Sequence, residues 1–226
     1  MKANINKKPA FSDAEKSGGM RGFSMIELVI TLVIVLILSA ISMPYIFNYK
    51  KRYKSEDQAL QVMDIMREAN QLALNKRRTM RLEIDLTDNK LLLIDEKDPG
   101  ASDDSEIKAI PLESPVDVRM DVIPTGITKP NPPNYNDAAF ATDTLGHKRG
   151  STTVTGHNVW MARFKSDGSV VNASETPISA NLYIWAPASA GSLTPRSKQE
   201  IRAITMFGGS GAVRYWKHDG TNFIPY

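Results

Sequence analysis

The longest apolar stretch of the chain begins at Leu28, and no charged residue occurs between Leu28 and Tyr49. Within this stretch, residues 28–47 are twenty mostly apolar residues. As an α-helix rising about 1.5 Å per residue they would extend about 30 Å, which is the thickness of the hydrocarbon core of a bilayer. The pattern therefore predicts a membrane-spanning helix over residues 28–47. Pro44 removes one backbone donor from that helix, so we expect a kink there.

A second helical pattern follows the apolar stretch. Small and apolar side chains recur at helical spacing at Ala59, Val62, Met63, Met66, Ala69 and Ala73. Polar side chains fall on the opposite side at Asp64, Arg67, Glu68, Gln71 and Asn75. Three cations at 76–78 suit the carbonyl end of a helix. We therefore expect one long helix over residues 23–78, whose second half packs its apolar side against a sheet.

After residue 78 the period of the pattern changes to that of a strand. Apolar residues at 80, 82, 84 and 86 alternate with charged residues at 81, 83 and 85, and a return strand over residues 90–95 completes a hairpin. Further strands are expected over residues 107–112, 116–123, 159–165, 169–172, 181–186, 200–207 and 212–218. The segment 124–158, rich in Pro, Asn, Thr and Gly, is expected to be a long surface loop. The predicted fold class is α+β, in which a long N-terminal α-helix, with a membrane half and an amphipathic half, packs on a globular antiparallel β-rich head over residues 79–226.

A polar leader, residues 1–22, precedes the apolar stretch. It holds five Lys or Arg and two Asp or Glu, so its net charge of +3 equals that of the whole chain. The remainder is neutral, and the charge of the chain therefore does not indicate a nucleic-acid partner. In an ordinary secretory signal the small-residue cleavage site follows the apolar stretch. Here Gly22 precedes it, so a cut at Gly22 would remove only the leader and keep the membrane segment.

The run Gly22-Phe23-Ser24-Met25-Ile26-Glu27-Leu28, with the apolar stretch behind it, resembles the processing motif of type IV prepilins. The resemblance implies cleavage between Gly22 and Phe23 by a prepilin peptidase, N-methylation of the new Phe23 amine, and a role for Glu27 as the assembly carboxylate. Glycine lets a backbone enter a peptidase cleft in an extended form. A carboxylate beside hydrocarbon is costly unless it is paired, and the terminal ammonium of a neighbouring subunit is a suitable partner. The alternative is an interfacial glutamate at the end of a plain signal anchor.

The predicted head is similar to the H-type minor pseudopilins of type II secretion and the FimT/FimU-type minor pilins (the GspH/FimT/FimU group). The matching pieces are residues 163–169, with an Asp-Gly turn, and residues 201–205 and 211–214. The resemblance implies a minor subunit of a type IV pilus or of a type II secretion pseudopilus. It implies a single-pass protein of the bacterial inner membrane with a cytoplasmic leader and a periplasmic head. The implied partners are other pilin or pseudopilin subunits, the prepilin peptidase/methyltransferase, the assembly platform and inner-membrane lipid.

DNA capture by a minor pilin during natural transformation is the alternative function. The residues that could serve it are Arg214 and Lys217 in the last strands and Lys148 and Arg149 elsewhere. Phosphate binding needs several cations on one face. Arg214 and Lys217 are three residues apart, so a regular strand would place them on opposite faces. Together with the neutral mature chain, this spacing argues against a nucleic-acid partner.

Few side chains suggest chemistry. The chain has no cysteine, which excludes disulfides and thiolate metal sites. The histidines 147, 157 and 218 lack metal-ligand spacing, and we expect them to be exposed or at strand ends. Residues 208–211 are glycine-rich but lack the lysine of a phosphate loop, so a hairpin connection is expected. The acidic residues 98, 103, 104 and 106 lack the spacing of a calcium loop and are expected to be solvated. The sequence therefore predicts no enzymatic activity, no cofactor and no metal.

Overall fold

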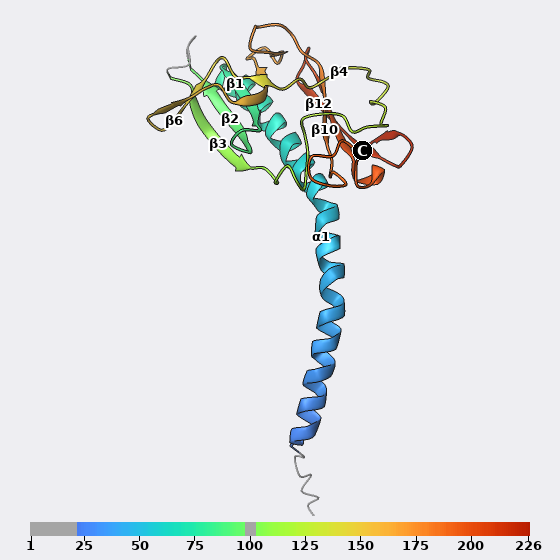
Figure 1. Ribbon diagram of the computed structural model, residues 1–226. Coiled ribbons are helices and arrows are strands. Elements are labelled where there is room, and N and C mark those ends of the chain that lie inside the picture. The colour runs from blue at the N-terminus through green and yellow to red at the C-terminus, as the bar shows by residue number, and fades with distance from the viewer. Residues whose placement is uncertain (1–21, 98–102) are drawn as a thin grey trace, which may run out of the picture. The chain divides into compact units, whose positions relative to one another are not determined.

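The computed structural model describes residues 22–97 and 103–226, without the side chains of seven helical positions between 44 and 52. The predictions for the leader before Gly22 and for Asp98 lie outside the described residues. Within them, the chain forms one long helix, thirteen strands and one turn of 3₁₀-helix (Figure 1). The fold class is α+β with mostly antiparallel strands, as predicted. The chain divides into two compact units, residues 1–46 and 47–226, which we describe separately.

The first unit contains the apolar half of helix α1 (Met25–Lys76). Its span Met25–Met43 is 19 residues long with a mean hydropathy of 2.7, and none of it is buried, so it is long and apolar enough to cross a membrane. Ser24 caps the helix, because its hydroxyl accepts a hydrogen bond from the Glu27 amide at 3.2 Å. The helix continues without a break through position 44, so Pro44 does not end it, and the kink stays a prediction.

The second unit contains the amphipathic half of α1. All six positions predicted for its apolar side are buried, which confirms the helical pattern over residues 59–73. They belong to a core shared with the strands of two sheets. The helix ends at Lys76, where Arg77 adopts a left-handed conformation with φ 53°. The Arg78 amide then donates to the Ala73 carbonyl at 3.3 Å, which satisfies one of the free carbonyls at the helix end.

The first sheet has eight strands built around the predicted hairpin. Its strands are β1 (Thr79–Asp85), β2 (Lys90–Glu96), β3 (Ser105–Pro111), β5 (Ala141–Thr142), β6 (His147–Arg149), β7 (Thr152–Val154), β8 (Asn158–Phe164) and β9 (Val170–Val171). The order is β5-β8-β1-β2-β3-β6-β7, with β9 paired to β8. Leu82 lies between Leu93 of β2 and Ala162 of β8 in this register. The apolar positions of the predicted alternation therefore share one face of the sheet.

The second sheet has five strands in the order β13-β12-β11-β10-β4. They are β4 (Asn136–Asp137), β10 (Ala180–Ile184), β11 (Arg202–Phe207), β12 (Ala212–His218) and β13 (Phe223–Pro225), and a 3₁₀ turn η1 (Lys198–Glu200) precedes β11. The glycine-rich residues 208–211 join β11 to β12, which confirms the predicted hairpin connection. A side chain at Gly208 would begin 2.1 Å from the Ile178 carbonyl oxygen, so only glycine fits there.

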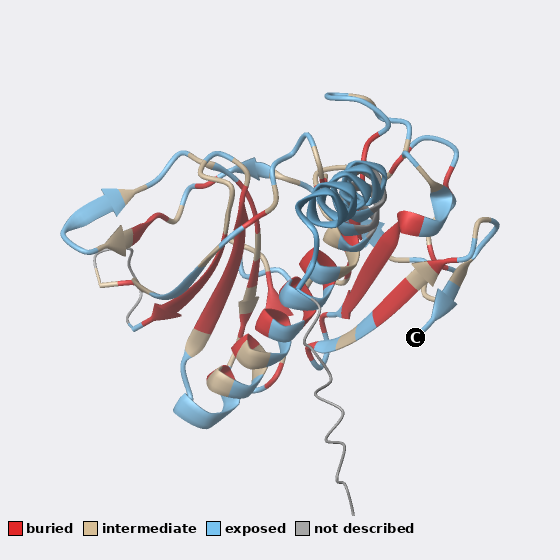
Figure 2. Cartoon of the chain, turned by 90° about the horizontal axis from the view of Figure 1, so that it is seen from below, coloured by how far each residue is buried: buried red, intermediate tan, exposed pale blue. Residues whose placement is uncertain are grey.

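The two sheets bury their inner faces against the same half of α1. Met80, Leu82 and Ile84 of β1 join the core from the first sheet. Leu182 and Ile204 join it from the second. Figure 2 shows these strands coloured as buried beside the amphipathic part of the helix. This common core fixes the inner faces, and the outer faces of the two sheets are covered by other segments of the chain.

Two predicted segments differ from the structure. The strand predicted over residues 116–123 is wrong, because the segment pairs only through an isolated bridge between Arg119 and Trp185. Its alternation is real, since Val118 and Met120 are buried, but a turn at Ser114–Asp117 precedes it and no regular partner strand extends the bridge. The segment expected as a loop over 124–158 holds the short strands β4, β5, β6 and β7. These strands add to the edges and ends of both sheets, β5, β6 and β7 to the first and β4 to the second.

Candidate functional site

The segment at the start of α1 carries the predicted processing and assembly residues. Gly22 and Phe23 precede the helix and belong to no helix or strand, and Phe23 is exposed. Glu27 occupies the first turn of α1 and is exposed. Within the described part of the chain, its carboxylate has no hydrogen-bond or ion-pair partner. The Ser24 and Glu27 positions also match a capping box, in which a glutamate three residues after the cap supports the helix start.

The cations considered for DNA binding are spread over different surroundings. Lys217 lies 2.6 Å from a Glu56 oxygen, and Arg149 lies 2.5 Å from Asp88, so ion pairs neutralise both. The Lys148 ammonium donates to the Thr153 hydroxyl at 2.5 Å. Among these four described cations, Arg214 alone is exposed to solvent.

The predicted opposite faces of Arg214 and Lys217 are confirmed. Arg214 lies over the Trp216 ring, 5.6 Å from its centroid, and Lys217 lies on the side of Tyr215, 6.0 Å from that ring. Residues two apart in a strand share a face, so the two cations cannot contact one phosphate backbone together.

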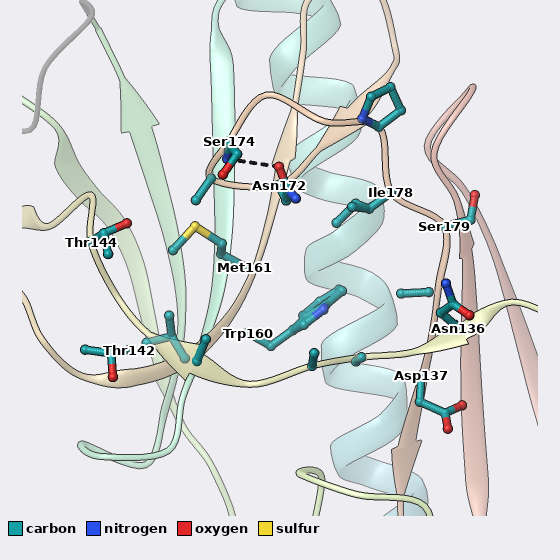
Figure 3. A pocket seen from close by; sticks show the side chains of 17 residues that line it. Asn136, Asp137, Thr142, Thr144, Trp160, Met161, Asn172, Ser174, Ile178 and Ser179 are labelled. Carbon is teal, nitrogen blue, oxygen red and sulfur yellow. Dashed lines mark hydrogen bonds between the residues drawn. The ribbon is translucent and has the colours of Figure 1, made fainter.

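A cavity of about 390 Å³ opens between residues 136–144, β8 and residues 172–180 (Figure 3). Trp160, Met161 and several small side chains line it. The amide of Ser174 donates to the Asn172 side chain at its rim, so these groups are used to shape a turn. Asp137 is the one ionisable side chain among the described lining residues, and it accepts a hydrogen bond from the Tyr183 hydroxyl at 2.9 Å. The cavity therefore brings no pair of acid and base groups together.

The outer face of the first sheet carries a layer of ionised side chains that we call the charged layer. Its carboxylates are Glu83, Asp85, Asp88, Glu96, Asp104, Glu106 and Asp143. Its cations are Arg81, Arg149 and Arg163, with His147 and His157 between them. Residues 143–149 cover this layer, with β6 paired to β3 at its edge. Seven carboxylates thus face three guanidinium groups in a largely buried place, which leaves an excess of negative charge.

Arg81 lies at the centre of the charged layer and is fully buried. Its guanidinium donates to the Gly146 carbonyl at 2.6 Å. It lies 3.0 Å from a Glu83 oxygen and 3.4 Å from oxygens of both Glu96 and Asp104. One cation therefore serves three carboxylates and also ties the covering segment to β1.

Burial shifts the pKa values of the acids around Arg81 upward. Desolvation raises the pKa of Glu83 to about 7, although the Arg81 charge opposes the rise. Desolvation likewise raises the pKa of Asp104 to about 6, against the same opposing charge. The pKa of His147 is lowered, chiefly because burial disfavours the imidazolium form. These directions agree with a layer that holds more carboxylates than it can neutralise.

The structure confirms one prediction about these residues and overturns another. His147 and His218 lie at strand ends, as predicted, and both are buried. Asp104 and Glu106 are not solvated loop acids, because Asp104 pairs with Arg81, and Glu106 lies in β3 beside His147 and Arg149. The reason that these acids are not solvated is the covering segment 143–149, which the sequence does not place. The sequence held one signal of a charged face, because the charged residues Arg81, Glu83 and Asp85 occupy alternate positions of β1.

Comparison with protein-family models, with curated proteins and with solved structures finds no significant match to this chain.

Proposed function

We propose that the chain is a prepilin-like protein whose mature form is a structural subunit, without enzymatic activity, of a type IV pilus or a type II secretion pseudopilus. The observation that carries the proposal is Glu27. Its carboxylate has no partner among the described residues, it follows Gly22 by five positions, and it lies in the first turn of an exposed apolar span of 19 residues. A carboxylate placed there is stable in hydrocarbon or among packed helices only when another molecule neutralises it.

In this proposal the missing partner is the ammonium group that cleavage creates at Phe23 of a neighbouring subunit. A subunit displaced along the filament would leave both charges unpaired, so the pair fixes the axial position of each helix. The exposed apolar half of α1 supports this assignment, since it offers a surface that lipid or neighbouring helices would cover. The proposed course is anchoring in the bacterial inner membrane with a periplasmic head, followed by assembly into the filament.

The test must separate charge pairing from helix capping, because Ser24 and Glu27 also form a capping box. Glu27→Gln keeps a residue that suits the capping box but removes the charge. We expect this full-chain variant to insert into the membrane normally and to enter filaments at least tenfold less often than the wild type. Ser24→Ala is the matched control, since it removes the cap, at a cost of about 1 kcal/mol, and keeps the charge. Normal assembly of Glu27→Gln would refute the pairing.

Processing is tested separately by sequencing the N-terminus of the full chain after expression with a prepilin peptidase. The proposal requires a mature protein that starts at Phe23 and carries one added methyl group. A mature chain that starts elsewhere would refute it. Gly22→Val, which adds a branched side chain at the cut, should leave the leader attached.

The assignment to a minor subunit of the GspH/FimT/FimU group rests on the resemblance of the strand pieces around the Asp167-Gly168 turn and β11–β12. DNA capture is not favoured by any contact described above, because Arg149 and Lys217 are already in ion pairs. A salt series of DNA mobility shifts with the full chain in detergent decides between the two. Binding at low salt that Arg214→Ala abolishes would support the DNA alternative.

A further inference from the structure

The charged layer contains a group of three side chains whose oxygen and nitrogen atoms face one another. Oxygens of Glu83 and Asp143 and a ring nitrogen of His147 all lie within 4.8 Å of one another. All three residues are buried, with exposed fractions of 1%, 4% and 1% respectively. Two carboxylates and an imidazole are ligands that divalent transition metals accept together.

The hydrogen bonds of His147 leave one ring nitrogen directed at this group. Nε2 lies 2.9 Å from a Glu106 oxygen, and a carboxylate can only accept, so Nε2 carries the proton. In the neutral ring, Nδ1 then holds a lone pair. Nδ1 is buried and has no hydrogen-bond partner among the described residues. A buried acceptor without a partner is costly, and it points to a ligand that accepts a lone pair.

The distance between His147 and Glu83 fits an ion better than a shared proton. Nδ1 lies 3.6 Å from the second Glu83 oxygen, which is too long for a hydrogen bond. A tetrahedral ion with bonds of about 2.1 Å places its ligand atoms about 3.4 Å apart. The first Glu83 oxygen faces Arg81 at 3.0 Å, so the two oxygens of this carboxylate have separate tasks.

The outer contacts hold the three ligands in place, as they do around metal ions in proteins. Glu106 orients the His147 ring through Nε2. Asp143 accepts hydrogen bonds from the amides of Leu145 and Gly146, at 2.9 and 3.0 Å, so its carboxylate is fixed by the turn that follows it. An excess of carboxylates over guanidinium groups surrounds the site, which favours a bound cation.

We propose that Glu83, Asp143 and His147 form a binding site for a divalent transition-metal ion of the zinc type. The ion links β1, through Glu83, to the segment that carries Asp143 and His147, and so fastens the cover of the first sheet. A second group, Asp85, Asp88 and His157, has similar composition. There, however, His157 Nδ1 already bonds to Asp85 at 2.7 Å and Asp88 pairs with Arg149, so the ligand atoms are engaged.

The second group supplies a matched control. The full chain, purified in detergent and stripped with EDTA, is titrated with Zn²⁺ by calorimetry. We expect one saturable site in the wild type and in His157→Gln, and at least a tenfold weaker site in His147→Gln. A hundredfold excess of Zn²⁺ over its dissociation constant should raise Tm by roughly 5–10 °C in the first two proteins and by little in the third.

Two further measurements keep the proposal testable if His147→Gln fails to fold. Asp143→Asn preserves the size of the side chain and its ability to accept a hydrogen bond from the Gly146 amide. This variant should also lose its binding of Zn²⁺. Trypsin cleavage after Lys148 or Arg149 should slow when Zn²⁺ is added to the wild type. The proposal is overturned if the stripped wild type binds no Zn²⁺ saturably, or if Asp143→Asn and His147→Gln bind it as tightly as the wild type does.

Discussion

The two sheets bury similar inner faces on one helix, yet their outer faces are built from opposite chemistry. The outer face of the second sheet is apolar and aromatic, with Tyr183, Ala203 and Trp216 side by side across three strands and Trp185 beside them. Ile127 and its neighbours cover them. The outer face of the first sheet carries the charged layer, which is largely hidden from solvent. Burial alone therefore does not tell which kind of face a strand presents.

On the aromatic face, the ring nitrogens of the two tryptophans each donate to a partner. The Trp185 ring nitrogen donates to the Val122 carbonyl at 2.9 Å, and that of Trp216 donates to the Thr205 hydroxyl at 3.0 Å. Among the described residues, the charged layer leaves several buried atoms without hydrogen-bond partners, including one Asp104 oxygen and His147 Nδ1. Apolar burial stabilises the fold directly, whereas buried charge does so only when it is compensated. The first sheet is therefore the more sensitive of the two to a change in ions or pH.

The largest effect is expected from removing the central cation of the charged layer. Arg81→Met keeps the length of the side chain but leaves Glu83, Glu96 and Asp104 without their shared partner. Breaking a buried ion pair in this way costs about 3–5 kcal/mol. Urea unfolding of the full chain in detergent, followed by circular dichroism at neutral pH, measures the loss. A loss below 1 kcal/mol would mean that the layer is compensated without Arg81.

A smaller effect is expected on the aromatic face. Trp185→Phe removes part of a fully buried ring and its hydrogen bond to Val122. The lost packing and the unpaired carbonyl together should lower the unfolding free energy by about 2 kcal/mol. The same urea experiment measures it, and the loss should be equal at pH 5 and pH 7 because no titrating group is removed. A pH-dependent loss would contradict the contrast between the two faces.

The pH dependence of stability should belong to the charged layer. The folded pKa of Asp104, about 6, lies above its ordinary value of 3.8, so the folded chain holds this proton more tightly than the unfolded chain. Its contribution to stability is therefore complete below pH 3.8 and is lost as the pH rises to about 6. Asp104→Asn has no titrating group at this position. The difference in unfolding free energy between the wild type and this variant should therefore change by about 1–2 kcal/mol between pH 4 and pH 7. Unfolding in the presence of EDTA measures it, and equal pH profiles would contradict the assignment.

The smallest effect is expected from a cation at the solvent side of the second sheet. Arg214 is exposed over the Trp216 ring, in contrast to the buried Arg81. Arg214→Ala should change the unfolding free energy by less than about 0.5 kcal/mol, since exposed cation–π contacts contribute little. Thermal unfolding of the full chain, compared with Arg81→Met, measures the difference. Similar losses for the two variants would show that burial does not decide the role of a cation here.

Much of the fold could be predicted because local patterns report local neighbours. The buried side of α1, the hairpin of β1 and β2, and the turn at Gly208–Gly211 all follow from spacing and from glycine. The strand predicted over residues 116–123 failed because a strand also needs a partner along its whole length. Alternation at Val118 and Met120 shows burial and not pairing. The candidate site divides in the same way. The proposed processing and assembly residues Gly22, Phe23 and Glu27 could be recognised from the sequence because they lie within a few residues of one another.

By itself, the sequence determined the apolar span with its lone Glu27, the helical and strand periods, and the odd spacing that puts Arg214 and Lys217 on opposite faces. Each of these depends on distances along the backbone, which the geometry of helices and strands fixes. Only the tertiary structure decided that Arg81, Glu83 and Asp85 lie under a cover on the outer face of their sheet, and that His147 meets Glu83 across 64 positions of sequence. Alternation marks which residues share a face of a strand. What covers that face depends on where distant segments return, and the segment 143–149 carries no local pattern that reveals its place.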